Sequence, residues 1–216
     1  MDLEDRFVRA RALFGEDFAK LQRARVVIFG VGGVGGFALD SLYRTGVGEI
    51  TIVDYDSFEL SNQNRQIGSE ALGERKVEAL ARLYGGIVAV CERVNEEFLS
   101  GFDLGGFDVV IDAIDDISAK VALAKRAYPK LISSMGSAKK LDPLQIKLDS
   151  VWKSYGDRFA RKFRESLKKE QFCGDFKVIF SPEPPACKEL GSFSAVTGSF
   201  GLLLASETIK KILNKE

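Results

Sequence analysis

Apolar runs of strand length alternate with amphipathic segments of helix length through most of the chain. Strands are predicted at residues 26–29, 49–54, 86–91, 107–111 and 131–134. Helices are predicted at residues 34–45, 74–84 and 117–127, with a short helix at 16–22 ahead of the first strand. Strands that alternate with helices build an α/β fold with a doubly wound, mainly parallel sheet, in which ligands bind at the carboxyl ends of the strands.

The pattern changes after residue 136. An edge strand is predicted at residues 141–148, a charged helix or pair of helices at 152–170, a strand at 177–180 and a long helix at 193–213. No internal repeat or low-complexity linker separates the two parts. We therefore expect a core at residues 1–135 and a smaller C-terminal portion at residues 136–216 that packs on it as one compact unit.

The turn after the first predicted strand is rich in glycine. It reads GVGGVGG and contains Gly30, Gly32, Gly33 and Gly35, and Asp54 ends the second strand. Glycine lets the backbone approach phosphates, the following helix N-terminus attracts their charge, and an acid about 20 residues farther on can bind a ribose. Because strand, turn, helix and acid agree, this Rossmann-like unit predicts a bound nucleotide.

The connection at residues 56–73 has no clean period and carries the motif SNQNRQ, with Asn62, Asn64 and Arg65. A loop of this length in a compact domain is usually functional. A guanidinium suits phosphate oxygens, and the amides suit a ribose or hold the loop in place. Lys76 opens the next helix, where a cation is unfavourable unless a phosphate lies nearby. The alternatives are a solvated loop and an ordinary surface lysine.

Acids cluster in the motif DAIDD, at the end of the strand predicted at residues 107–111. Asp112, Asp115 and Asp116 would repel one another unless a cation or hydrogen-bond donors offset their charge. Mg²⁺ that bridges a carboxylate and a triphosphate is the natural candidate. One of Asp115 and Asp116 is alternatively the N-cap of the helix that follows.

Composition excludes several kinds of chemistry. The 216 residues include no histidine, so one chain has no histidine-based acid–base catalysis, Ser-His-Asp triad or histidine metal site. Cys91, Cys173 and Cys187 form no CxxC pair, which argues against structural zinc and favours a reducing compartment, so we expect a cytoplasmic protein. The longest apolar stretch, residues 193–205, is too short and too polar to span a membrane.

Taken in order and spacing, GVGGVGG, DYD, SNQNRQ, Lys76 and DAIDD resemble the adenylating fold of the ubiquitin-activating, ThiF- and MoeB-like enzymes. The resemblance covers roughly residues 6–134. It implies an ATP-binding adenylation core in which the glycine turn holds ATP, Asp54 binds the ribose, Arg65 and Lys76 contact the phosphates and Asp115 serves Mg²⁺. Asn62, Asn64 and Asp116 are further candidates for cofactor binding.

The same resemblance implies a homodimer, because an N-terminal arginine in that family reaches the ATP of the partner subunit. The segment RFVRARALFG suggests Arg9 for this role, with Arg6 and Arg11 as alternatives. Arg9 therefore joins Arg65, Lys76 and Asp115 as a candidate catalytic residue.

The second half resembles one branch of that family, the tRNA threonylcarbamoyladenosine dehydratases. The motifs that carry this resemblance are SSMGSAKKLDPLQI, KVIFSPEPP and GSFSAVTGSFGLLLASETI. It implies ATP-dependent activation of the carboxylate of a threonylcarbamoyl group on a tRNA adenosine, followed by ring closure. Adenylation needs ATP, Mg²⁺ and stabilising cations but no histidine. Closure within one molecule needs positioning more than a nucleophilic side chain.

A tRNA substrate requires positive surface, and residues 152–170 carry an excess of basic residues interleaved with aromatic ones. Basic side chains supply affinity for phosphates, and an aromatic ring can stack on an unpaired base. The candidate tRNA-binding residues are Lys139, Lys140, Arg158, Arg161, Lys162 and Arg164. The alternative is an amphipathic surface helix whose aromatic residues belong to the core.

Two other functions stay open. An enzyme of the same fold could adenylate the C-terminus of a ubiquitin-like sulfur carrier, with Cys173 or Cys187 as a nucleophile and with a sulfur-relay partner protein. The missing CxxC pairs and the basic segment weigh against it. An NAD-dependent oxidoreductase or a dinucleotide sensor would leave Arg65, Lys76 and the DAIDD acids without a purpose.

Overall fold

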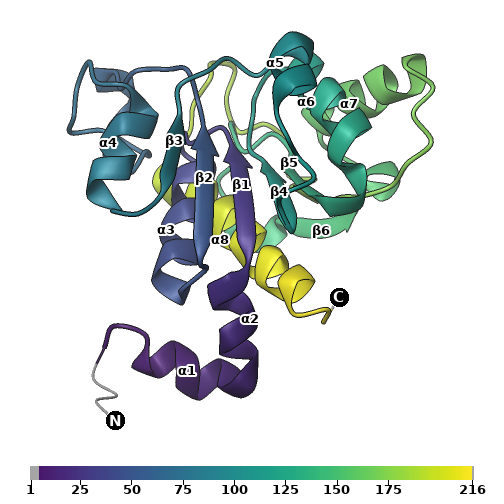
Figure 1. The fold of residues 1–216 in the computed structure, drawn as a ribbon. Coiled ribbons are helices and arrows are strands. Elements are labelled where there is room, and N and C mark those ends of the chain that lie inside the picture. The colour runs from purple at the N-terminus through teal and green to yellow at the C-terminus, as the bar shows by residue number, and fades with distance from the viewer. Residues whose placement is uncertain (1–4, 216) are drawn as a thin grey trace.

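The computed structural model describes residues 5–215, which build a seven-stranded sheet with helices on both faces (Figure 1). The strand order is β3-β2-β1-β4-β5-β7-β6, and every neighbouring pair is parallel except β6 and β7. The strands are β1 Arg25–Phe29, β2 Glu49–Val53, β3 Val88–Val90, β4 Val109–Asp112, β5 Leu131–Ser134, β6 Lys147–Ser150 and β7 Lys177–Phe180. The predicted doubly wound, mainly parallel fold is confirmed.

Helices α3, α4 and α8 pack on one face of the sheet and α5, α6 and α7 on the other (Figure 1). Helices α1 and α2 precede β1, and α2 packs against the end of α8. The bounds are α1 Val8–Phe14, α2 Phe18–Arg23, α3 Gly35–Thr45, α4 Lys76–Leu83, α5 Glu96–Gly101, α6 Ile117–Ala127, α7 Arg158–Lys169 and α8 Ser194–Ile212.

The apolar strand sequences follow from the two cores. In β1, Val26 and Ile28 are buried in the core beneath α3 and α8, whereas Val27 and Phe29 are buried in the core beneath α6 and α7. A strand that is covered on both faces needs apolar side chains in both directions, so its sequence shows a continuous apolar run.

The C-terminal part completes the same sheet. Strand β7 pairs with β5, β6 forms the antiparallel edge, and α8 packs against α3. The contact between the two helices is close because Gly201 of α8 has no side chain. A Cβ there would lie 2.3 Å from the carbonyl oxygen of Val34.

Several element bounds differ from the prediction. The edge strand begins only at Lys147, because residues 143–145 form a short 3₁₀ turn capped by Asp142, whose carboxylate accepts from Leu144 N. The charged helix begins only at Arg158, where the Asp157 carboxylate accepts from Ala160 N. Helices α1 and α5, of seven and six residues, are not predicted. No helix within residues 5–215 is long and apolar enough to cross a membrane.

Candidate active site

A cavity of about 520 Å³ opens at the carboxyl ends of β1, β2, β4 and β5. The glycine turn, the loop that holds Arg65, the start of α4, the DAIDD loop and residues 134–138 line it. Its volume is that of a small-molecule site. The position is the one that the doubly wound fold predicts, because the carboxyl ends of the parallel strands meet there.

The glycine turn packs so tightly that side chains are excluded. Gly30 has φ 84°, and a Cβ there would lie 2.7 Å from the Ala113 carbonyl oxygen. A Cβ at Gly35 would lie 1.8 Å from the Gly30 carbonyl oxygen. Gly32 and Gly33 line the cavity directly. The turn therefore presents backbone and the N-terminus of α3 to a ligand, which suits phosphate groups.

Asp54 holds the glycine turn and its own loop together. Its Oδ2 accepts from Val31 N at 2.9 Å, and its Oδ1 accepts from Asp56 N at 2.9 Å. Each carboxylate oxygen can accept a second hydrogen bond. Asp54 lines the cavity with this remaining capacity, as a ribose-binding acid requires.

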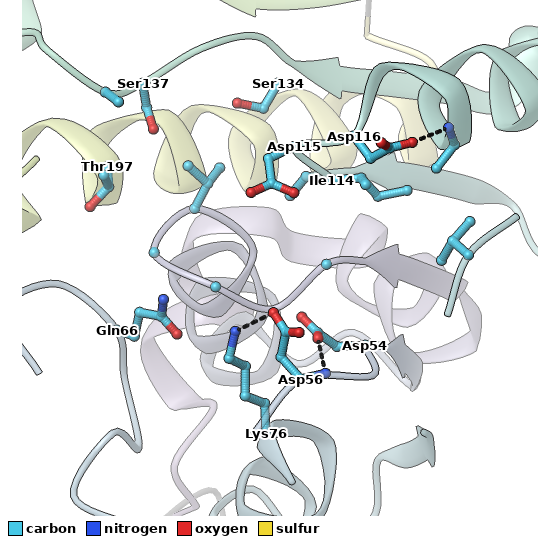
Figure 2. Close-up of a pocket in the computed structure, with 18 of the residues that line it drawn as sticks. Asp54, Asp56, Gln66, Lys76, Ile114, Asp115, Asp116, Ser134, Ser137 and Thr197 are labelled. Carbon is cyan, nitrogen blue, oxygen red and sulfur yellow. Dashed lines mark hydrogen bonds and ion pairs between the residues drawn. The ribbon is translucent and has the colours of Figure 1, made fainter. Parts of the chain in front are cut away.

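Lys76 and Asp56 form an ion pair at the cavity. The Lys76 Nζ donates to Asp56 Oδ2 at 3.0 Å, and the side chain of Lys76 is 7% exposed against 47% for Asp56. Figure 2 shows Lys76 with Asp56 on one side of the glycine turn and Asp115 on the other. Asp56 belongs to the DYD motif, but nothing in the sequence assigns it this contact.

Some residues of the SNQNRQ motif line the cavity, and others hold the loop in place. Arg65 lines the cavity, and its Nη1 donates to Ser61 O and to Asn64 Oδ1, both at 2.8 Å. Asn64 Nδ2 donates to Ser192 O, and the buried Asn62 accepts from Glu59 N. Neither asparagine lines the cavity, so both hold the loop in place rather than contact a ligand there.

Gln66 lines the cavity although sequence reasoning did not select it. Its Oε1 is buried and has no hydrogen-bond partner among residues 5–215. Ser134, Ser137 and Thr197 are further cavity residues that the sequence did not single out. They come from distant segments, and only their adjacency to the motif residues in space identifies them.

The three DAIDD acids point in different directions. Asp116 Oδ1 accepts from Ala119 N at 2.8 Å and caps α6, so Asp116 is the N-cap that the sequence left open (Figure 2). Asp112 is fully buried and pairs with Lys120. Asp115 alone is exposed in the cavity without such a structural role. No group of three or more metal-ligating side chains exists within residues 5–215, so a metal here would need oxygens from the ligand as well.

The basic residues differ in exposure. Arg158, Arg161 and Lys162 are exposed on α7, whereas Arg164 is half-buried and donates to Ser154 Oγ. Lys139 is half-buried and donates to Lys188 O. The expectation that Lys140 faces tRNA is wrong, because it is 7% exposed and its Nζ donates to the Ser181 and Glu183 carbonyl oxygens.

The aromatic residues of this segment belong mostly to the core. Phe163 is fully buried, and Trp152 Nε1 donates to Gly174 O at 2.8 Å. Phe159 lines the cavity, and Tyr155 is exposed. Tyr155 and Phe159 are therefore the candidates among these rings for contact with a base or nucleoside.

Helix α1, in the segment that holds the N-terminal arginines, lies at the end of the sheet opposite the carboxyl ends of the parallel strands (Figure 1), whereas the cavity opens at those carboxyl ends. Arg6 stacks on the rings of Phe7 and Tyr43, and Arg11 pairs with Asp5 at 2.8 Å. Arg9 is exposed on α1. None of the three lines the cavity of its own chain.

All three cysteines are free and exposed, and none lines the cavity. Cys187 donates to Glu189 O and Cys173 to Gln171 O. The site therefore offers carboxylates, cations, hydroxyl groups and backbone amides, but no thiol. This set can bind a nucleotide and stabilise charge that develops on phosphate.

Known proteins resemble this chain over most of its length. The tRNA threonylcarbamoyladenosine dehydratase of Bacillus subtilis is 37% identical over 185 residues, which cover 81% of this chain and 73% of the relative. The molybdopterin-synthase adenylyltransferase of Salmonella typhimurium is 29% identical over 216 residues, which cover 95% of this chain and 80% of the relative.

The fold agrees with that of a solved dehydratase. The E. coli tRNA N6-threonylcarbamoyladenosine dehydratase, TcdA, in complex with AMP matches with a TM-score of 0.92 at 29% identity, covering 100% of this chain and 98% of that one. Its complex with ATP matches with a TM-score of 0.88 at 30% identity, covering 97% and 94%. The ThiF family profile matches residues 6–216, and this chain therefore belongs to the ThiF family.

Proposed function

We propose that this chain is an ATP-dependent tRNA threonylcarbamoyladenosine dehydratase that works through a carboxyl adenylate. The observation that carries the proposal is the match to the ATP complex of the E. coli dehydratase over 97% of the chain. The cavity supports it, because the glycine turn, Asp54, Arg65, Lys76 and Asp115 surround one space.

ATP is bound along the glycine turn. Asp54 accepts hydrogen bonds from the ribose with the capacity that its two backbone contacts leave free. Lys76 and Arg65 contact the phosphates, and the Lys76 ammonium exchanges its bond to Asp56 for a phosphate oxygen. Asp115 is the residue that would hold Mg²⁺, and the ion would supply positive charge against the triphosphate.

The reaction has two steps. The substrate carboxylate attacks the α-phosphorus of ATP, and pyrophosphate leaves. The carbamoyl oxygen of the same group then attacks the activated carbonyl carbon, its nitrogen loses a proton, and AMP leaves as the ring closes. Because the attacking atom belongs to the substrate, no protein thiol is needed, in agreement with cysteines that lie outside the cavity.

The enzyme acts as a homodimer in which Arg9 reaches the nucleotide of the partner subunit. Two observations support this role: no residue of α1 lines the cavity of its own chain, and Arg6 and Arg11 are engaged in local contacts. Mixing Arg9→Ala with Lys76→Ala subunits tests it, since each heterodimer would carry one intact site and restore roughly a quarter of the activity. An active monomer in light scattering contradicts it.

The tRNA docks on the exposed basic residues of α7, principally Arg158, Arg161 and Lys162, with Lys139 nearer the cavity. They lie on the helix that also supplies Phe159 to the cavity wall, so phosphate contacts there can bring the modified nucleoside to the ATP. We place the enzyme in the cytoplasm on the basis of this proposed tRNA substrate. A sulfur-relay protein is a candidate partner.

A second function rests on the match to the molybdopterin-synthase adenylyltransferase. That function would be adenylation of the C-terminus of a sulfur-carrier protein. ATP–pyrophosphate exchange separates the two proposals. Exchange that requires tRNA bearing threonylcarbamoyladenosine supports the dehydratase. Exchange that requires a carrier protein with a free C-terminus, and ignores this tRNA, supports the second function.

A further inference from the structure

Lys120 is a buried cation that the proposed chemistry does not use. It lies in α6, one turn beyond the Asp116 cap, and none of its surface is exposed. Its Nζ contacts Asp112 Oδ2 at 2.8 Å, Ser134 O at 2.8 Å and Ile114 O at 3.1 Å. An ammonium has three protons to donate, so these contacts use its full capacity.

The acceptors come from two strands that meet at the cavity. Asp112 and Ile114 belong to the end of β4 and the loop after it, and Ser134 ends β5. Ile114 and Ser134 both line the cavity, and Ile114 immediately precedes Asp115 (Figure 2). Lys120 therefore joins the backbone that carries Asp115 to the backbone on the neighbouring strand.

Asp112 bonds to the same loop and to the same neighbouring strand as Lys120. Its Oδ1 accepts from Ile114 N at 3.1 Å, and its Oδ2 accepts from Ser133 Oγ at 2.6 Å as well as from Lys120. Both the N–H and the carbonyl group of Ile114 are thus bonded, one to each member of the ion pair. The loop conformation ahead of Asp115 is determined by groups outside the loop.

Stability alone gives little reason for such a pair. Desolvation opposes the charged form, and burial lowers the pKa of Lys120 while the Asp112 charge opposes that shift. Apolar side chains of similar volume often replace a buried ion pair without loss of stability. What apolar residues cannot do is bond two backbone carbonyl groups at the cavity wall.

We infer that Lys120 is a positioning residue for adenylation: it holds the backbone before Asp115 against β5, so that the Asp115 carboxylate meets Mg²⁺ and the triphosphate on the glycine turn. This inference rests on the proposed function for its Mg²⁺ and ATP. It assigns a role to a residue that touches neither ligand, in the way that groups behind a metal ligand orient the ligand.

The test replaces the pair without leaving a lone buried charge. In the variant Lys120→Met with Asp112→Asn, the asparagine keeps an acceptor for Ile114 N and can donate to Ser133, while the two carbonyl groups are left without their donor. The matched control is Lys125→Met with Glu170→Gln, which removes an exposed pair that also involves α6. Both are measured for ATP binding by calorimetry across a Mg²⁺ titration, for ATP–pyrophosphate exchange, and for thermal unfolding.

The positioning role predicts that the buried-pair variant binds ATP without Mg²⁺ as the wild type does, because the glycine turn and Lys76 are intact. The Mg²⁺ concentration at which the effect of Mg²⁺ on ATP binding is half-maximal (the Mg²⁺ midpoint) should rise by about 10- to 100-fold. The rate of ATP–pyrophosphate exchange at saturating ATP should fall by about the same factor. The control should change neither. An unchanged Mg²⁺ midpoint overturns the role, even if stability falls, since a purely structural residue lowers the folded fraction and leaves the midpoint alone.

If the double variant does not fold, the milder variant Ser133→Ala tests the same role, because it removes one hydrogen bond to Asp112. It should raise the Mg²⁺ midpoint by a smaller factor than the double variant, and an unchanged midpoint would overturn the role. The calorimetric measurement also separates this inference from the proposed function. Wild-type protein that binds Mg²⁺ and ATP but shows no exchange with the modified tRNA refutes the substrate, whereas the midpoint shift still reports on Lys120.

Discussion

Lys76 and Lys120 both pair with an aspartate, Asp56 in the loop after β2 and Asp112 at the end of β4, yet their surroundings differ. The Lys76 side chain is 7% exposed and its partner Asp56 is 47% exposed, in the wall of the cavity. The side chains of Lys120 and its partner Asp112 are both 0% exposed, behind that wall. The atoms of the two pairs are separated by similar distances, 3.0 and 2.8 Å, so distance does not distinguish them.

Burial of the acid decides what each lysine can do. If a phosphate takes the Lys76 ammonium, the Asp56 carboxylate is released into water at little cost. If anything took the Lys120 ammonium, Asp112 would remain as an uncompensated charge in the interior. Lys76 is therefore suited to exchange partners during a reaction, and Lys120 is suited to keep the same partners throughout.

The largest expected effect is on stability, from Lys120→Met alone. This change leaves the buried Asp112 charge without its partner, so the free energy of unfolding should fall by about 3–5 kcal/mol. Urea unfolding measures it, with Lys125→Met as the control, where loss of the exposed, solvent-screened pair with Glu170 should lower the free energy of unfolding far less. An equal loss of unfolding free energy in the two variants would show that the buried pair matters no more to stability than the exposed pair.

Next in size is the effect of Lys76→Met on catalysis. Methionine keeps much of the packing of the lysine stem, so the free energy of unfolding should change by less than about 1 kcal/mol. The rate of ATP–pyrophosphate exchange should fall about 100- to 1,000-fold, because the variant has no cation there to stabilise the developing phosphate charge. A variant with near wild-type exchange would show that Lys76 is only part of the scaffold.

The comparison of exposed and buried cations extends to tRNA binding. Reversal of Arg158, Arg161 and Lys162 to glutamate should weaken tRNA binding and leave ATP binding intact, because these side chains are exposed on α7. The slope of log K against log salt should become shallower by roughly one for each phosphate that the variant no longer neutralises. Arg44→Glu with Arg82→Glu, on α3 and α4, is the charge-reversal control. Normal tRNA binding by the α7 variant would make its basic face an ordinary solvated surface.

The smallest effect concerns Asp157, a buried acid that forms no ion pair with any residue that the structure describes. Its Oδ2 has no hydrogen-bond partner within residues 5–215, and burial raises the pKa of the carboxyl above its ordinary value of 3.8, although the Ala160 N–H and the charges of Lys140 and Arg164 oppose this. Above that value the folded protein keeps a proton that the unfolded chain has released, so stability falls as pH rises until the raised pKa is passed.

Asp157→Asn keeps an oxygen for the cap of α7 and removes this titration. Thermal unfolding from acid to neutral pH should show that the variant is stabilised relative to the wild type, by an amount that grows as pH rises and then levels off. A variant that is less stable than the wild type at neutral pH would mean that the Asp157 charge is favourable to the fold.

The residues of the nucleotide site were predictable from the sequence where they belong to one continuous motif. Gly30, Gly32 and Asp54 belong to one strand–turn–helix–strand unit, and their positions follow from its geometry. The Asp116 cap was predictable to within one residue for the same reason. Apolar runs also indicated the strands of the parallel sheet, because β1, β2, β4, β5 and β7 are buried on both faces; β3 is exposed at the edge, and only three of its six predicted residues form a strand.

Contacts between distant segments were not predictable. Lys120 is an ordinary helical lysine in the sequence, and only the pairing of β4 with β5 brings Asp112 and Ser134 to it. Lys139 and Lys140 are adjacent in sequence, but carbonyl groups from residues 181 and 183 bury the second one. No periodic signal distinguishes them, since the chain there is neither helix nor strand.

Nucleoside analysis of a reacted tRNA tests the central claim most directly. The protein, Mg-ATP and tRNA bearing threonylcarbamoyladenosine are incubated, the tRNA is digested under mild neutral conditions, and the nucleosides are identified by mass spectrometry. We predict a cyclic nucleoside that is lighter by one water, with one AMP and one pyrophosphate formed for each ring closed. An unchanged nucleoside, under conditions in which the protein consumes ATP to activate the C-terminus of a sulfur-carrier protein, would contradict the proposal.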